Sequence, residues 1–373
     1  MKIVFTGGGT GGHFYPIIAI ARALNKQVKE GGRTAKLYFF SVDPYDTASL
    51  EKENIIFKHI PAGKIRLYFS PQNFLDIIKI FWGAWVAIIK LFFIYPDVVF
   101  GKGGYASFPT LLAARILRIP VIIHESDTIP GRVNRWAGKF AARVALSYPE
   151  AHTYFPQGKT AVTGQPIREE LFLPYGQNEP RKIILEEEIP TIAVIGGSQG
   201  AHVLNDTILD VLPILLPYYN VLHQTGGKNF EASNQRAQIV LQQIKNGSRY
   251  HAFPFFDAQL LREVAHLTDI FISRSGSMIF EIAAWGKPSI LIPISEEVSR
   301  DQTKNAFSYA RTGGAVVIEE KNLTPHILEA ELRRIASSQE VFSRMQEAAR
   351  NFSKEDAALK IALEIVRFSL KHE

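Results

Sequence analysis

The stretch KIVFTGGGTGGH (residues 2–13) passes from an apolar, strand-like run into a loop with five glycines. The stretch TIAVIGGSQGA (residues 191–201) repeats this pattern, and DVVFGKGGY (residues 97–105) places another glycine loop after another strand. Glycine lets the backbone turn sharply and brings amide N–H groups close to an anion, and a helix that follows adds partial positive charge. Two strand–glycine–helix openings therefore predict two parallel sheets, each with an anion site at its carboxyl edge.

The rest of the chain follows the same plan. Short apolar runs alternate with helix-like stretches, which favours an α/β fold of doubly wound parallel sheets. We expect helices at residues 16–24, 201–212 and 355–370. We expect strands at residues 3–6, 36–40, 98–100, 121–124, 144–146, 191–195, 219–224, 270–273, 289–293 and 315–318.

Prolines, a glycine and an acidic run between residues 166 and 190 predict a domain boundary there. We therefore expect one domain over residues 1–165 and a second over residues 166–354. Residues 1–165 hold 20 Lys and Arg against 10 Asp and Glu, whereas the rest of the chain has a small acidic excess. This asymmetry indicates that the first domain meets an anionic partner, the alternative being that its basic side chains are only solvated.

The residues disfavour several other functions. The chain has no cysteine, which excludes disulfides, thiolate metal sites and a cysteine nucleophile. The first glycine loop lacks the Gly-Lys-Ser/Thr of a P-loop, and Asp43, the acidic residue after the next expected strand, lies too far on for an NAD site. The first residues do not resemble a signal peptide, and no basic cluster or motif indicates a nucleic acid partner.

Residues 77–95 are the most hydrophobic segment, near the roughly 20 residues that a membrane span needs. Lys79 and Lys90 interrupt this segment and a core strand follows it, so we expect one or two helices on the face of the sheet. The aromatic and basic residues over 64–95 have the composition of an anchor on an anionic membrane surface. The alternative is a helix buried wholly in the core.

Polar residues at the carboxyl ends of the expected strands are candidate site residues. His13 lies where a helix begins, and a neutral histidine there can act as a general base, although capping or packing is the alternative. Glu125 and Asp127 follow another strand, where Asp127 could also cap a helix. Groups suited to a pyrophosphate, a ribose and sugar hydroxyls follow the later strands, at Ser277, Glu281, Asp301, Gln302 and Asn305.

In this combination and order, the motifs resemble the MurG family of N-acetylglucosaminyltransferases over essentially the full chain. The matching residues are 8–13 with Pro16, 103–105, 124–125, 130–131 with Asn134, 163–168, 196–201, 274–276 with Glu281, and 301–302 with Asn305. The resemblance implies a GT-B fold, with two Rossmann-like domains facing a cleft. It also implies that a last helix, within residues 355–373, packs back on the first domain.

The resemblance further implies an inverting transfer of GlcNAc from UDP-GlcNAc to the C4 hydroxyl of the MurNAc-pentapeptide. The acceptor would be the undecaprenyl-pyrophosphoryl lipid I, and the product lipid II of peptidoglycan synthesis. No cofactor or metal is expected. The implied location is peripheral, at the cytoplasmic face of the bacterial cell membrane, with other cell-wall synthesis proteins as further partners.

The resemblance also implies residue roles. His13 is the first candidate for the catalytic base and Glu125 the second. The residues implied in donor binding are Thr10, Gly11, Gly12, Asp127, Arg168, Ser198, Phe256, Ser277, Glu281, Asp301 and Gln302. The residues implied in binding the acceptor pyrophosphate are Gly9, Gly103, Gly104 and Tyr105.

The chain departs from the family pattern in three places. Asp127 stands where many members have asparagine, residues 274–281 are one residue shorter, and residues 256–269 are slightly longer. Two alternatives stay open at this point. One is another GT-B enzyme, such as a glycolipid synthase or a UDP-sugar epimerase, and the other is a nucleotide-sugar-binding subunit without catalysis.

Overall fold

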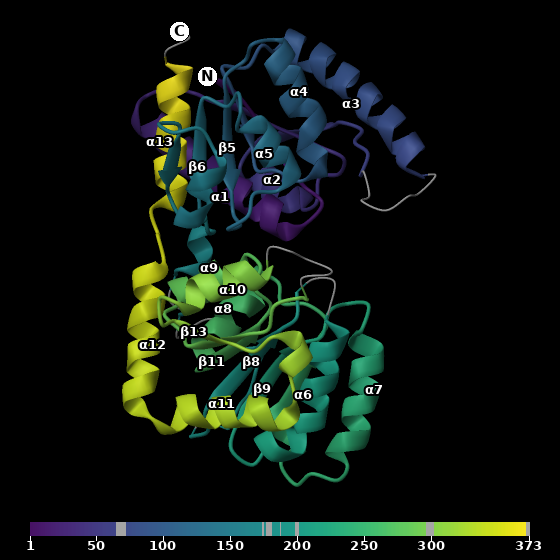
Figure 1. Cartoon of the computed structure of the whole chain (residues 1–373), viewed down its shortest axis with the longest axis vertical. Helices are drawn as coiled ribbons and strands as arrows, with labels where there is room; N and C mark the ends of the chain where they lie inside the picture. Colours follow the sequence, from purple (N-terminus) through teal and green to yellow (C-terminus); the bar gives the residue numbers. More distant parts are fainter. Residues whose placement is uncertain are drawn as a thin grey trace. The chain divides into compact units, whose positions relative to one another are not determined.

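The structure of the chain is a computed structural model that describes residues 1–64, 72–173, 175–176, 181–186, 188–197, 201–295 and 302–370. The chain divides into two compact units (Figure 1). The amino-terminal unit contains Met1–Arg168 and Lys354–Glu373, and the carboxy-terminal unit contains Glu169–Ser353. The sequence-based boundary, between residues 165 and 166, lies three residues before this division. Each unit is a parallel sheet with helices, as the glycine-loop pattern predicted.

The amino-terminal unit is built on a seven-stranded parallel sheet in the order β3-β2-β1-β4-β5-β6-β7. The central strands are apolar on both faces, which is typical of a parallel sheet covered by helices on both sides. In β1, Ile3 and Phe5 enter one core and Val4 enters the other. The strands are β1 (Lys2–Thr6), β2 (Lys36–Ser41), β3 (Ile55–His59), β4 (Val98–Gly101), β5 (Val121–Glu125), β6 (Arg143–Leu146) and β7 (Thr160–Val162).

Two helix layers cover this sheet. On one face α1 packs beside α13, and their apolar side chains share a core with Ile3 and Phe5 (Figure 1). On the other face α3 packs beside α4, over the core that contains Val4. The helices of the unit are α1 (Gly11–Glu30), α2 (Thr47–Lys52), α3 (Gln72–Ile94), α4 (Phe108–Ile116), α5 (Arg132–Ala137) and α13 (Ala357–Ser369).

The last helix, α13, brings the end of the chain into the amino-terminal unit. Ile361, Ala362 and Ile365 are buried against the helix α1 core. Glu364 pairs with Arg143 of β6, with Nε and Oε1 3.0 Å apart. A stripe of apolar residues at helical spacing therefore has a partner surface, which explains why this segment is helical.

The carboxy-terminal unit repeats the plan with a six-stranded parallel sheet in the order β10-β9-β8-β11-β12-β13. Its strands are β8 (Thr191–Ile195), β9 (Asn220–Gln224), β10 (Tyr250–Phe253), β11 (Ile270–Ser273), β12 (Ser289–Leu291) and β13 (Ala315–Val317). Its helices are α6 (His202–Leu215), α7 (Phe230–Leu241), α8 (Ala258–Leu267), α9 (Met278–Ala284), α10 (Gln302–Ala310), α11 (Pro325–Ser337) and α12 (Gln339–Phe352).

Three strands were missing from the sequence-based prediction, namely β3, β7 and β10, and all three are edge strands. An edge strand pairs on one side only and is half exposed, so it lacks the continuous apolar run of a central strand. The strand expected over residues 289–293 ends at Leu291, and the helix expected over residues 16–24 begins at Gly11. The first helix therefore takes in two of the glycines and places Pro16 in its interior.

Candidate functional site

Three loops of the amino-terminal unit meet at one edge of its sheet. They follow β1, β4 and β5, which are neighbours in the sheet, so all three leave at the carboxyl edge. They are tightly packed: a Cβ on Gly104 would come within 3.0 Å of the Gly8 carbonyl oxygen, and one on Gly103 within 2.8 Å of Asn134 Nδ2. Gly103 and Gly104 also have φ of +93° and +79°, a backbone conformation that favours glycine. The glycines are therefore required by geometry, as the loop interpretation predicted.

His13 lies in the first turn of α1, above this edge. Its Nδ1 is 3.0 Å from Thr10 Oγ1, and a Cβ on Gly104 would lie 3.5 Å from the imidazole ring. Burial, together with the positive charge of Lys102, lowers the pKa of His13 to about 3, so the imidazole is neutral at physiological pH. If Nδ1–H donates to Thr10, the unprotonated Nε2 is left as the proton acceptor that a general base needs.

Glu125, the second base candidate, ends β5 and is buried. Its Oε1 accepts the Asp127 N–H, and its Oε2 accepts the Gly131 N–H and the Asn134 Nδ2–H, each at 3.0 Å. Burial and the charge of Asp127 raise its pKa to about 7, against the opposing effects of Lys102 and these hydrogen bonds. Because both oxygens are engaged within the 125–134 loop, Glu125 organises that loop, and His13 is the better placed of the two to accept a proton.

Lys102 is a residue of this edge that the sequence interpretation missed. It follows β4, is 1% exposed, and its Nζ has no hydrogen-bond partner among the described residues. Burial lowers its pKa to about 8, whereas the charges of Glu125 and Asp127 raise it. A lysine inside a glycine loop gave no signal beyond its type, because only the fold shows that its ammonium group is buried beside two acids.

Arg168 belongs to the amino-terminal unit and is held there by an aromatic side chain. Its guanidinium carbon lies 3.9 Å from the centre of the Tyr15 ring, within the range of a strong cation–π contact. Tyr15 in turn meets Tyr45 edge to face, with ring centres 5.8 Å apart. Among the described residues, Arg168 Nε is buried and has no hydrogen-bond partner. Tyr15 was not among the candidates, because its sequence position marks it only as a residue of the first helix.

The carboxy-terminal unit places its candidates at the carboxyl edges of β11 and β12. The Ser275 hydroxyl donates to the Gln302 carbonyl oxygen at 2.7 Å, which ties the two loops together. Ser277 is the N-cap of α9, and Glu281 lies in the first turn of that helix. Arg274 is occupied structurally, since it pairs with Glu320 at 2.6 Å. Ser277, Glu281 and Gln302 are thus brought to one edge, while Ser198 and Asp301 lie outside the described residues.

Phe256 was expected among the residues that bind the donor, whose nucleotide carries a uracil base. Its side chain is 3% exposed, and its N–H donates to Gln224 Oε1 at 2.9 Å. The neighbouring Phe255 is the exposed aromatic residue of this turn. A base at this position would therefore meet backbone atoms or Phe255 rather than the Phe256 ring.

Both units match one family of enzymes. Residues 3–146 match the glycosyltransferase family 28 N-terminal domain, and residues 191–361 match the glycosyltransferase family 28 C-terminal domain. A Bacillus cereus protein named UDP-N-acetylglucosamine–N-acetylmuramyl-(pentapeptide) pyrophosphoryl-undecaprenol N-acetylglucosamine transferase 2 is 34% identical over 343 residues, 91% of this chain and 93% of that protein. The chain belongs to glycosyltransferase family 28. The predicted family resemblance and transferase class are therefore confirmed.

Solved structures agree with this family 28 assignment. The crystal structure of Acinetobacter baumannii MurG is similar with a TM-score of 0.71 and 25% identity, and the similarity covers 98% of this chain and 99% of that one. A Neisseria meningitidis UDP-GlcNAc 2-epimerase, solved with UDP-GlcNAc bound, has a TM-score of 0.68 at 14% identity, covering 98% of this chain and all of that one. The second similarity shows the GT-B fold alone, so the fold does not separate transferases from epimerases.

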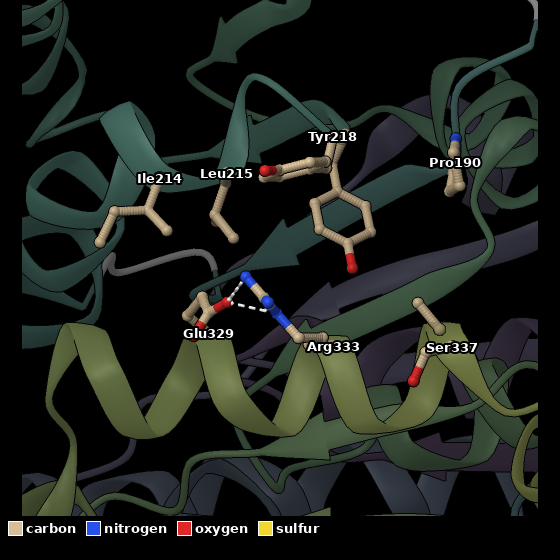
Figure 2. Close-up of a pocket in the computed structure, with 9 residues that line it drawn as sticks. Pro190, Ile214, Leu215, Tyr218, Glu329, Arg333 and Ser337 are labelled. Atoms are coloured by element: carbon tan, nitrogen blue, oxygen red, sulfur yellow. Dashed lines mark hydrogen bonds and ion pairs between the residues drawn. The ribbon is translucent and has the colours of Figure 1, made fainter.

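The carboxy-terminal unit has a cavity of about 370 Å³ that lies away from the candidate site residues (Figure 2). Pro190 and Tyr219 directly precede β8 and β9, so the cavity is at the amino edge of the sheet, whereas α/β enzymes bind ligands at the carboxyl edge. Figure 2 shows Glu329 and Arg333 of α11 facing Leu215 and Tyr218, and these two charges pair with each other at 2.6 Å. The cavity does not belong to the candidate site.

Among the described residues of this family 28 chain, no group of three His, Cys, Asp or Glu is placed to hold a metal ion.

In the part of the chain that the structure describes, α3 is the one helix long and apolar enough to cross a membrane, over Phe74–Ile94, and only 22% of its most apolar window is buried. The exposed side chains include Phe81 (70%) and Phe93 (79%), so α3 is not a wholly buried core helix.

Proposed function

We propose that this chain transfers GlcNAc from UDP-GlcNAc to the C4 hydroxyl of the MurNAc-pentapeptide of an undecaprenyl-pyrophosphoryl acceptor. The observation that carries the proposal is the Bacillus cereus transferase of that name, whose similarity spans 93% of its own length. The anion-binding turns and the neutral histidine of the amino-terminal unit fit such a reaction. The acceptor hydroxyl must lose a proton, which a neutral histidine can accept. The leaving group is a diphosphate, which anion-binding turns can stabilise.

The proposed chemistry is a single displacement. The acceptor oxygen attacks the anomeric carbon from the face opposite UDP, the bond from that carbon to the UDP oxygen breaks, and the configuration inverts from α to β. His13 Nε2 takes the hydroxyl proton, as a neutral imidazole can. Arg168 and the amides at the start of α9 stabilise the charge that develops on UDP. In this proposal the reaction needs no metal.

The roles divide between the two units. We assign the acceptor pyrophosphate to the loops that carry Gly9, Gly103, Gly104 and Tyr105, because their amides lie at one carboxyl edge. We assign the donor to Thr10, Gly11, Gly12, Asp127 and Arg168 of the amino-terminal unit, and to Ser198, Phe256, Ser277, Glu281, Asp301 and Gln302 of the carboxy-terminal unit.

An acceptor panel tests this proposal against its rivals. Purified protein is given labelled UDP-GlcNAc with lipid I, with diacylglycerol, or with no acceptor. We expect labelled lipid and released UDP only with lipid I. Labelled diacylglycerol would indicate a glycolipid synthase, conversion of UDP-GlcNAc without acceptor would indicate an epimerase, and no turnover at all would indicate a binding subunit.

Tyr15 gives a test of the proposed donor contact. We expect Tyr15→Ala to raise the KM for UDP-GlcNAc about two- to thirtyfold, since a cation–π contact contributes about 0.5–2 kcal/mol. Tyr15→Phe keeps the ring under the Arg168 guanidinium and is the matched control, with a KM near that of the unaltered protein. Steady-state kinetics at saturating acceptor gives both values. Equal KM values for the two variants would contradict the role of the Tyr15 ring.

We further propose that the exposed face of α3 places the protein on the cytoplasmic surface of the bacterial membrane as a peripheral protein. The side chains of Phe81, Trp82 and Phe93 are 60–79% exposed. Exposure of such large apolar side chains to water is unfavourable, and their burial at a lipid interface is favourable. Lys79 and Lys90 of the same helix suit anionic lipid headgroups. Other cell-wall synthesis proteins are the alternative partners of this face.

A vesicle experiment tests the membrane proposal. We expect Phe81→Ser/Trp82→Ser/Phe93→Ser to weaken binding to phosphatidylglycerol-containing vesicles by at least about 100-fold, because each aromatic side chain contributes about 1.5–3 kcal/mol on burial. Leu359→Ser is the control, since Leu359 is 39% exposed on α13, a helix of the opposite face of the sheet. Co-sedimentation measures both. Unchanged binding of the triple variant would exclude α3 as the membrane contact.

A further inference from the structure

Two acids stand where the proposed function places a diphosphate. Glu125 ends β5 and Asp127 follows it, and β5 is the strand next to β4, whose loop carries the amides assigned to the acceptor pyrophosphate. Like charges at short range oppose each other strongly where the surroundings are apolar. Glu125 is itself 3% exposed, so water screens its charge poorly. The edge therefore needs a positive charge if it is to accept an anion.

Lys102, which is buried beside the first glycine loop, supplies that charge. Its backbone N–H donates to the Thr6 carbonyl oxygen at 2.9 Å, which fixes it between β1 and β4. A Cβ on Gly7 would lie 3.2 Å from the Lys102 Cβ, so the lysine side chain begins directly beneath the first glycine loop. The opposite charges that act on it are those of Glu125 and Asp127, and neither acid forms a hydrogen bond to Nζ.

A buried ammonium group without a hydrogen bond has a large desolvation cost, which the opposite charges of Glu125 and Asp127 partly offset. Removing one partner from a group of buried opposite charges is destabilising, because the remaining charge is left uncompensated. Methionine at this position keeps an unbranched side chain of similar length but carries no charge. A change from lysine to methionine therefore removes the charge while it keeps most of the stem.

We propose that Lys102 is a positioning residue for the acceptor: its buried charge offsets Asp127, so that the edge formed by the glycine loops accepts a diphosphate. The inference rests on the proposed function. Lys102 acts through the field of the edge and does not touch the reacting atoms.

A double-mutant cycle tests the charge pair. We expect Lys102→Met to raise the KM for lipid I about tenfold when Asp127 is present, because the negative charge of Asp127 is then left uncompensated near the anion. In the Asp127→Asn background the same change is expected to raise that KM by less than about threefold. Lys102→Arg keeps the charge and is expected to stay within about threefold of the unaltered protein in both backgrounds.

Each outcome decides the inference. A purely structural role for Lys102 would give the same increase in both backgrounds and would overturn it, as would an unchanged KM in Lys102→Met. Lys139→Met, an exposed lysine of the same unit, controls for the loss of a positive charge in general. If Lys102→Met does not fold, Asp127→Asn alone must lower the KM for lipid I, and an unchanged or raised KM would contradict the pair. Turnover by the unaltered protein tests the proposed function separately.

Discussion

We expect His13→Ala to lower turnover by about two to four orders of magnitude, the contribution of a well-placed general base. The Kd for UDP-GlcNAc should change little, because the imidazole is assigned to the acceptor hydroxyl. The His13 ring is held by Thr10 Oγ1 at 3.0 Å and lies over Gly104, so its Nε2 is the atom left to accept a proton. Single-turnover kinetics with lipid I, combined with calorimetric titration of the donor, measures the two quantities.

Two further variants sharpen this prediction. His13→Asn retains a donor near the position of Nδ1, so it can keep the Thr10 contact, but it lacks the Nε2 proton acceptor. We expect it to be about as inactive as His13→Ala. His59→Ala removes an exposed histidine of the same unit and is expected to turn over normally. Turnover of His13→Asn near that of the unaltered protein would show that another group takes the proton.

The second large effect is expected at Glu125. In Glu125→Gln one carboxylate oxygen becomes an NH₂ group, which either faces the Asp127 N–H or faces the Gly131 N–H and Asn134 Nδ2. Either orientation opposes donor to donor in a buried position. We expect the free energy of unfolding to fall by about 2–5 kcal/mol, since each unsatisfied buried donor costs about 1–3 kcal/mol. Turnover should fall at least about tenfold with it, because the 125–134 loop borders the site.

Glu364→Gln is the matched control for this variant. Glu364 also accepts a hydrogen bond in the amino-terminal unit, from Arg143 at 3.0 Å, but this pair is partly exposed. We expect a loss of at most about 1 kcal/mol, the usual range for such a pair. Urea denaturation followed by circular dichroism compares the two proteins. If Glu125→Gln were as stable as Glu364→Gln, the loop would not depend on the carboxylate.

Much of the fold could be predicted because local sequence patterns indicate it. The glycine loops after β1, β4 and β8 mark where strands give way to helices, and the central strands are continuous apolar runs. The edge strands β3, β7 and β10 were not predicted, because they are short and half exposed. The helix α3 was expected from its hydrophobicity, but only the structure shows that most of its apolar window is exposed.

The site could be predicted less completely. His13 and the glycines of its loop follow from motif and position, because their roles depend on the backbone that they form. Lys102 and Tyr15 could not be found in this way. Their importance comes from partners distant in the sequence, namely the two acids after β5 for Lys102 and Arg168 for Tyr15. No local pattern reports such a juxtaposition.

The central claim is that this chain forms one new glycosidic bond, with inversion, at the acceptor's C4 hydroxyl. Nuclear magnetic resonance of the product made from UDP-GlcNAc and lipid I, with UDP quantified in the same reaction, tests it most directly. We predict a β linkage to the muramyl C4 oxygen and one UDP released for each bond formed. An α linkage, a bond to another oxygen, or UDP released with free GlcNAc in place of the disaccharide would contradict it.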